Sequence, residues 1–182
     1  MPGRRRATAS DFLEIPEDDR FHELLGGELV QRAAPSFRHG AAQGCVASVL
    51  IASGQRRGWR LAQSCEIRLA PDTIVRPDVA GWRRERLPSP PRQGPVDVVP
   101  DWTCEILSRS NAVRDLWDKM QLYHQAGVPH YWVIDPDRQT LRVHRWTPQG
   151  YHAVLSAGAA DTVRAEPFEA LALSLAELFD EG

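Results

Sequence analysis

Two acidic residues lie in apolar surroundings where a solvated charge is not expected. Asp78 follows Pro77 in a predicted strand, and Glu105 lies between Cys104 and Ile106 in another. Two carboxylates in one partly desolvated place repel each other and raise one pKa, unless a divalent cation such as magnesium neutralises them. The alternative interpretation is that each carboxylate lies at a strand end and reaches water or an arginine.

A lysine follows Glu105 after one short connection. Lys119 is the only lysine of the chain, which has 22 lysines and arginines in total. Asp115, Lys119 and Tyr123 are spaced four residues apart, so they share one face of a predicted helix. An ammonium beside two carboxylates could orient or deprotonate a water, or stabilise charge developing on a phosphate. The alternative is an ordinary Asp115–Lys119 pair on a solvated face.

Length and composition indicate a folded, water-soluble domain. The 182 residues suit one compact unit, so we expect a single domain over residues 1–182, with a flexible N-terminus over residues 1–10. Hydrophobic residues make up 42% and charged residues 25%, which is ordinary globular usage. The formal net charge of −2 excludes an overall positive field. Contact with nucleic acid must therefore be local or metal-mediated.

The termini and cysteines predict a cytoplasmic protein. No apolar run approaches the roughly 18 residues that cross a bilayer. The basic start, Met1–Arg6, is followed by acidic residues and proline where a secretion signal would be apolar. Cys45, Cys65 and Cys104 form no C-x-x-C pair, so we expect reduced and mostly buried thiols.

The first half of the chain predicts two helices and several strands. In order these are a short helix capped by Ser10 or Asp11 and ending at about Ile15, a strand over Glu28–Ala33 after the Gly26-Gly27 turn, a helix over Ser36–Gln55, and a hairpin of strands Trp59–Leu69 and Ile74–Trp82. Five prolines between Leu87 and Pro100 remove too many amide donors for a helix or a central strand. That segment is predicted to be a surface loop.

The second half predicts a strand, a helix and then mainly strands. The predicted elements are the strand Trp102–Leu107, a helix Ala112–Ala126 capped by Ser110 or Asn111, a hairpin of Tyr131–Ile134 with Thr140–Trp146, edge strands Tyr151–Leu155 and Thr162–Ala165, and a helix within Leu171–Phe179. Trp117 and Tyr123 belong to the apolar stripe that is predicted to face inward on the helix Ala112–Ala126. Gly127 is predicted to end this helix. This order predicts an α/β (α+β) fold with a mixed central β-sheet flanked by helices.

Several separated motifs resemble the Uma2 family (DUF820). They are the run Pro100–Asn111, the group Arg114-Asp115-Leu116 with Lys119 and Tyr123, the run Ala126–Pro136, and shorter stretches at Phe21–Val30, Pro35–His39 and Arg76–Val79. The resemblance covers about Asp11 to Trp146. Proteins of this family look like members of the PD-(D/E)XK nuclease superfamily, so the resemblance implies a restriction-endonuclease-like core.

The resemblance also implies a catalytic set. Asp78 matches the family's Pro-Asp aspartate and Glu105 its strand glutamate, which together bind a divalent metal, Mg²⁺ or Mn²⁺. Lys119 matches a lysine that stands on the helix instead of the strand, since residue 107 is Leu. In the superfamily a metal-bound water attacks a phosphodiester and the lysine positions that water. The implied activity is a Mg²⁺-dependent DNA endonuclease.

Four further residues are predicted to support the site. Glu23 matches a family glutamate that either approaches the metal or forms a structural salt bridge. His39 matches a family histidine, either as a helix cap or at the edge of the site. Asp115 and Tyr123 share the helix face of Lys119. The chain departs from common family residues at Gly26, Arg109 and His130, none of which is a metal ligand.

Other functions stay open at this point. One is a catalytically silent nuclease-fold module for nucleic-acid or protein binding, and another is a metal-dependent hydrolase of a small phosphoester. A homodimer is expected because small nucleases of this fold often pair to cut both strands. Two arginine clusters, Arg56, Arg57 and Arg60 and then Arg83, Arg84 and Arg86, either bind phosphate or serve solubility.

Overall fold

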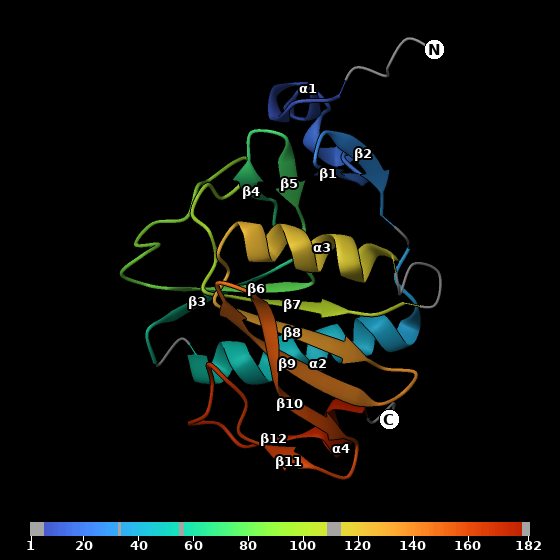
Figure 1. Ribbon diagram of the computed structural model, residues 1–182, viewed down its shortest axis with the longest axis vertical. Helices are drawn as coiled ribbons and strands as arrows, with labels where there is room; N and C mark the ends of the chain where they lie inside the picture. Colours follow the sequence, from blue (N-terminus) through green and yellow to red (C-terminus); the bar gives the residue numbers. More distant parts are fainter. Residues whose placement is uncertain (1–5, 33, 55–56, 109–113, 180–182) are drawn as a thin grey trace.

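The centre of the protein is a six-stranded mixed sheet, seen in a computed structural model (Figure 1). The structure describes residues 6–179 except 33, 55–56 and 109–113. The strand order is β10-β9-β8-β7-β6-β3. The strands are β3 (Trp59–Gln63), β6 (Val79–Arg83), β7 (Trp102–Ile106), β8 (His130–Asp135), β9 (Thr140–Thr147) and β10 (Gly150–Gly158). Strands β7 and β8 are parallel and the other neighbours are antiparallel, which confirms the predicted mixed sheet.

Two helices cover opposite faces of this sheet (Figure 1). The helix α2 (Phe37–Gly54) packs on one face against Trp102, Cys104 and Ile106 of β7. The helix α3 (Arg114–Gln125) lies on the other face, where Tyr123 packs among side chains of the sheet. Because side chains alternate along a strand, Glu105 points to the α3 face. The strand β7 thus presents its one acidic side chain to the helix that carries Lys119.

A second, four-stranded sheet lies beyond α3 (Figure 1). Its order is β2-β1-β5-β4, formed by β1 (His22–Leu25), β2 (Glu28–Gln31), β4 (Ile67–Ala70) and β5 (Thr73–Val75). The helix α1 (Ala9–Leu13) and the 3₁₀ turn η1 (Glu17–Asp19) precede this sheet. Leu24 and Ile74, which pair across β1 and β5, form a small core with Phe12 of α1.

The hairpin predicted over residues 59–82 is wrong. Each predicted strand is broken in two, and the halves belong to different sheets: β3 and β6 to the large one, β4 and β5 to the small one. The first break follows Ser64, whose φ of +48° is incompatible with a continuous strand. The second contains Pro77, which has no amide hydrogen to donate. As a result Asp78 lies at the junction between the two sheets.

Three smaller predictions also need correction. The cap of α1 is Thr8, whose hydroxyl accepts from the Asp11 backbone N–H at 3.2 Å, and not Ser10 or Asp11. Trp117 is 60% exposed and does not belong to the inward face of α3. The predicted last helix is shorter, because β12 (Leu173–Ser174) precedes α4 (Leu175–Phe179) and pairs with β11 (Thr162–Val163).

Other predictions are confirmed or lie outside the described residues. The long helix near residues 36–55 is α2, and Gly127 ends α3 with a φ of +76°. The caps predicted at Ser110 or Asn111 lie outside the described residues. The three cysteines are free thiols, of which Cys104 is buried and the other two are partly buried. Among the described residues, no helix has the length and apolar character that a membrane span requires.

Gly81 on β6 lets three large side chains of the neighbouring strands β3 and β7 meet beside it. A Cβ at this position would lie 2.7 Å from Cδ2 of Leu61, 3.2 Å from the ring of Trp102 and 3.3 Å from the ring of Trp59. We therefore expect Gly81→Ala to lower the free energy of unfolding by about 1–3 kcal/mol, as overpacking does. Urea denaturation measures this change. Gly44→Ala, with open space in an exposed turn of α2, is the control and should be neutral or stabilising. Equal effects at both positions would contradict the packing argument.

Candidate active site

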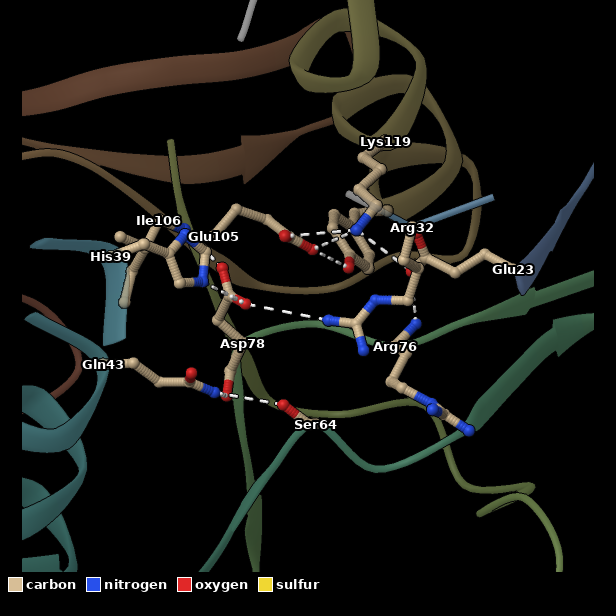
Figure 2. Close-up of polar contacts among 11 residues, drawn as sticks. Glu23, Arg32, His39, Gln43, Ser64, Arg76, Asp78, Glu105, Ile106 and Lys119 are labelled. Atoms are coloured by element: carbon tan, nitrogen blue, oxygen red, sulfur yellow. Dashed lines mark hydrogen bonds and ion pairs between the residues drawn. The ribbon is translucent and has the colours of Figure 1, made fainter. Parts of the chain in front are cut away.

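A cavity of about 90 Å³ lies where the two sheets, α2 and α3 come together. Its charged and histidine side chains are Glu23, Arg32, His39, Asp78, Glu105 and Lys119 (Figure 2). Apolar side chains such as Leu25 and Leu116 complete the wall. The residues come from segments that are up to 96 positions apart in the chain, from Glu23 to Lys119. Tertiary folding therefore builds this site, because no single local motif contains it.

Glu105 and Lys119 form a buried ion pair. The Lys119 Nζ lies 3.1 Å from Oε1 and 3.2 Å from Oε2 of Glu105. The Tyr123 hydroxyl donates to the same Oε1 at 2.6 Å. Both side chains reach Glu105 from one face of α3, as their spacing of four residues predicts. Glu105 and Lys119 are each only 8% exposed, so this carboxylate and this ammonium satisfy each other away from bulk water.

Burial and neighbouring charges set the protonation of this pair. Burial raises the pKa of Glu105 to about 7, with the Lys119 charge acting against the rise and the Asp78 and Glu23 charges adding to it. Burial alone would lower the pKa of Lys119, but the negative charges of Glu105 and Glu23 outweigh burial and raise that pKa above its ordinary value. Lys119 therefore stays protonated at neutral pH.

Asp78 is held from three sides at the start of β6. Its Oδ2 accepts from the Ile106 backbone N–H at 2.7 Å, which fixes it beside the end of β7. Its Oδ1 lies 3.0 Å from Nε2 of His39 and 3.8 Å from a guanidinium nitrogen of Arg32. The side chain of Gln43 donates to the Asp78 backbone carbonyl at 2.8 Å. Asp78 is 4% exposed, so these contacts fix a nearly buried carboxylate.

His39 reaches Asp78 because α2 begins next to the site. The Ser36 hydroxyl accepts from the His39 backbone N–H at 3.3 Å and caps the helix. The histidine itself is therefore not the cap, and its side chain lines the cavity at the edge of the site. Its Nδ1 is buried without a hydrogen-bond partner among the described residues.

Glu23 connects the small sheet to Lys119. Its Oε1 lies 3.0 Å from Lys119 Nζ and accepts from the Arg76 backbone N–H at 2.5 Å. The Arg76 guanidinium donates to Glu66 at 2.6 Å, and Arg20 donates to the other oxygen of Glu66 at 2.6 Å. Glu23 is thus salt-bridged to the lysine, in agreement with one of its two predicted roles.

The structure brings together six of the seven residues that the sequence indicated. Asp78, Glu105, Lys119, Glu23, His39 and Tyr123 are linked by the contacts above. The side chain of Asp115 lies outside the described residues. Two further residues that contact Asp78, Arg32 and Gln43, were not predicted from the sequence, although Gln43 lies one helical turn after His39.

The described arginines of the two clusters do not line this cavity. Arg60 donates to the carbonyls of Leu87 and Pro88, and the Arg83 guanidinium lies 4.1 Å from the ring centroid of Trp59. Arg86 pairs with Asp101 at 2.5 Å. These arginines serve the packing and connections of β3 and β6, and Arg56 lies outside the described residues.

Asp78 and Glu105 are the residues that could hold a cation. Carboxylate oxygens are the ligands that magnesium and manganese prefer. Within the described ranges, no three histidine, cysteine or acidic side chains are grouped as a ready metal cage. A two-carboxylate site still fits magnesium, which keeps several waters and binds to proteins through one or two carboxylates together with substrate phosphates.

Comparison with known proteins gives one family match and a similar solved structure. The model of the Uma2 family, described as “Putative restriction endonuclease”, matches residues 9–176. Among solved structures, a protein described as “a putative nuclease belonging to DUF820” from Anabaena variabilis superposes with a TM-score of 0.76 at 27% sequence identity. That match covers 96% of this chain and 98% of the other. No curated protein matches.

The Tyr123 hydroxyl provides a test of the charged state of Glu105. Tyr123→Phe removes a hydrogen bond to a buried carboxylate, so we expect a loss of about 1.5–3 kcal/mol in the free energy of unfolding at pH 8. The loss should shrink below pH 7, because the pKa of Glu105 is about 7 and the protonated acid forms a weaker bond. Urea denaturation in EDTA at pH 6 and pH 8 measures both values.

Tyr151→Phe is the matched control for this prediction. The Tyr151 hydroxyl donates to the neutral carbonyl of Val128 at 2.7 Å. Removal of this hydroxyl should lower the free energy of unfolding by about 1 kcal/mol, and this loss should be the same at pH 6 and pH 8. A Tyr123→Phe penalty that is as small and as insensitive to pH as the control would show that Glu105 is not an anion at pH 8.

Proposed function

The chain belongs to the Uma2 family, and from this premise we propose that it is a metal-dependent endonuclease that hydrolyses phosphodiester bonds of DNA. The observation that carries the proposal is the convergence of Asp78, Glu105 and Lys119 in one cavity. Lys119 Nζ lies 3.1 Å from Glu105, and Asp78 is anchored to the residue that follows Glu105. This is the residue set that the family resemblance implies, with the lysine supplied by α3.

Asp78 and Glu105 would hold Mg²⁺ or Mn²⁺ through their carboxylate oxygens. Repulsion between the two carboxylates and their burial, which raises the pKa of Glu105, favour a divalent cation at this place. Such an ion supplies an acidified water and offsets the negative charge of the phosphate. His39 and the Ile106 backbone N–H orient Asp78, and Tyr123 orients Glu105.

In this proposal Lys119 acts as a hydrogen-bond donor and not as a base. Because the charges of Glu105 and Glu23 raise its pKa, the ammonium keeps its proton at neutral pH and cannot serve as a general base. It can donate hydrogen bonds to the attacking water and stabilise negative charge on the phosphate. Of the three roles that the sequence left open, orientation of the water and stabilisation of charge on the phosphate are therefore favoured over deprotonation of the water.

A cleavage assay tests the proposal. Purified protein is incubated with supercoiled plasmid and with single-stranded DNA in Mg²⁺, Mn²⁺ or EDTA. We expect metal-dependent nicking that falls at least about 10²-fold in Asp78→Asn, Glu105→Gln and Lys119→Ala, because each removes a group at the reacting centre. Glu85→Gln, an exposed acid outside the cavity, is the control and should cleave like the wild type.

Calorimetry with Mn²⁺ separates catalysis from binding. Metal binding that requires both Asp78 and Glu105 is expected. Absence of cleavage together with absence of such binding would contradict the proposal and favour a nuclease fold retained for binding nucleic acid or protein. Cleavage that survives in all three variants would place the reacting centre elsewhere.

The homodimer and the cytoplasmic location stay predictions.

A further inference from the structure

We infer that Arg32 is a phosphate-binding residue that holds the phosphodiester of the substrate above Asp78 and Glu105. The inference rests on the proposed function, because it names how that site would bind its substrate. Arg32 follows directly after β2 and lines the cavity. Figure 2 shows its side chain reaching across the cavity toward Asp78.

The guanidinium of Arg32 is held in place with few bonds. Its backbone N–H donates to the Phe21 carbonyl at 2.9 Å, which fixes the start of the side chain. Its side chain is 27% exposed, yet among the described residues its one charged partner is Asp78, at 3.8 Å. That distance is too long for a hydrogen bond. A guanidinium has five N–H donors, so most of this donor capacity has no hydrogen-bond partner among the described residues.

Asp78 does not need Arg32 as a partner. Both oxygens of Asp78 already accept closer contacts, from His39 at 3.0 Å and from the Ile106 backbone N–H at 2.7 Å. A partly exposed guanidinium without hydrogen bonds to the protein keeps its donors available for a ligand.

Two other arginines near the cavity differ from Arg32 because each has a close acidic partner. Arg20 and Arg76 each donate to Glu66 at 2.6 Å, and their charges are thereby used within the protein. Among the residues that the structure describes, Arg32 and Lys119 are the arginine and lysine side chains that line the cavity, and Lys119 is bonded to Glu105 and Glu23. Arg32 is therefore the cavity's cation with the most donor capacity left for a ligand.

The ligand that best fits this arginine is a phosphodiester. A guanidinium matches two phosphate oxygens at once, and such charge-assisted pairs are stronger than neutral hydrogen bonds. The net charge of −2 gives the protein no general attraction for DNA, so local or metal-mediated contacts must supply it, and a contact from Arg32 would be a local one. Arg32 lies beside the acids that would activate the water, which places the bound phosphate at the reacting centre.

The test compares Arg32→Gln and Arg32→Lys with Arg86→Gln. The last variant removes the same charge from a surface pair with Asp101 outside the cavity. Steady-state cleavage in Mg²⁺ gives kcat/KM, and fluorescence anisotropy in EDTA gives the affinity for a labelled 20-nucleotide single strand and its duplex between 50 and 200 mM salt. Thermal unfolding verifies that each variant is folded.

We expect Arg32→Gln to lower kcat/KM by about 10²–10³-fold, as removal of one preorganised donor does. Its binding should weaken, and the slope of log affinity against log salt should become shallower by about 0.7–0.9, the value for one lost phosphate contact. Arg32→Lys should recover the salt slope but only part of kcat/KM, because it keeps the charge and loses the fork geometry. Arg86→Gln should match the wild type.

The outcomes separate this inference from the proposed function. Cleavage by Arg32→Gln within twofold of the wild type, with an unchanged salt slope, would overturn the role of Arg32 and leave the nuclease in place. The wild type could also fail to cleave while its DNA binding depends on Arg32 and not on Arg86. This result would support the role of Arg32 in phosphate binding and contradict the proposed nuclease activity. No cleavage and no effect on binding would overturn both.

Discussion

The buried pair of Glu105 and Lys119 is the interaction on which the arrangement of the site depends. Two charges that are each only 8% exposed are stable only while they stay together. Loss of one partner from such a pair costs about 3–5 kcal/mol, because the other is left buried and uncompensated. The pair therefore requires α3 to lie close over β7. It also explains why Glu105 tolerates burial and why Lys119 keeps its proton.

The same lysine joins the two sheets of the protein. Lys119 contacts Glu105 on the large sheet and Glu23 on the small one, so each sheet contributes one carboxylate to a single ammonium. Glu23 also accepts from the backbone of Arg76, which immediately precedes the Pro77-Asp78 step into β6. A displacement of the small sheet would therefore move both the lysine and the segment that carries Asp78. The small sheet forms a wall of the site and helps to set its geometry.

The sequence predicted the site better than it predicted the strands around it. Asp78 and Glu105 could be recognised because a carboxylate in apolar surroundings is unusual, and Lys119 with Tyr123 because helical spacing fixes a common face. The split of the predicted hairpin could not be recognised, because the apolar pattern continues through Ser64 and only its backbone angle shows the break. Nothing in the sequence indicated that Arg32 lines the cavity, because its position depends on how β2 packs against distant elements.

The placement of the lysine on a helix makes the site dependent on hydrophobic packing. Residue 107 follows Glu105 by two positions, and here Leu107 lines the cavity where a strand lysine would stand. The ammonium instead comes from α3, whose Leu116 and Met120 pack against the core between this helix and the sheet. A lysine on the strand would be positioned by backbone hydrogen bonds, whereas Lys119 is positioned by how closely α3 packs. Core residues beneath α3 thereby control the distance between the lysine and Glu105, and the packing of this face becomes part of the chemistry of the site.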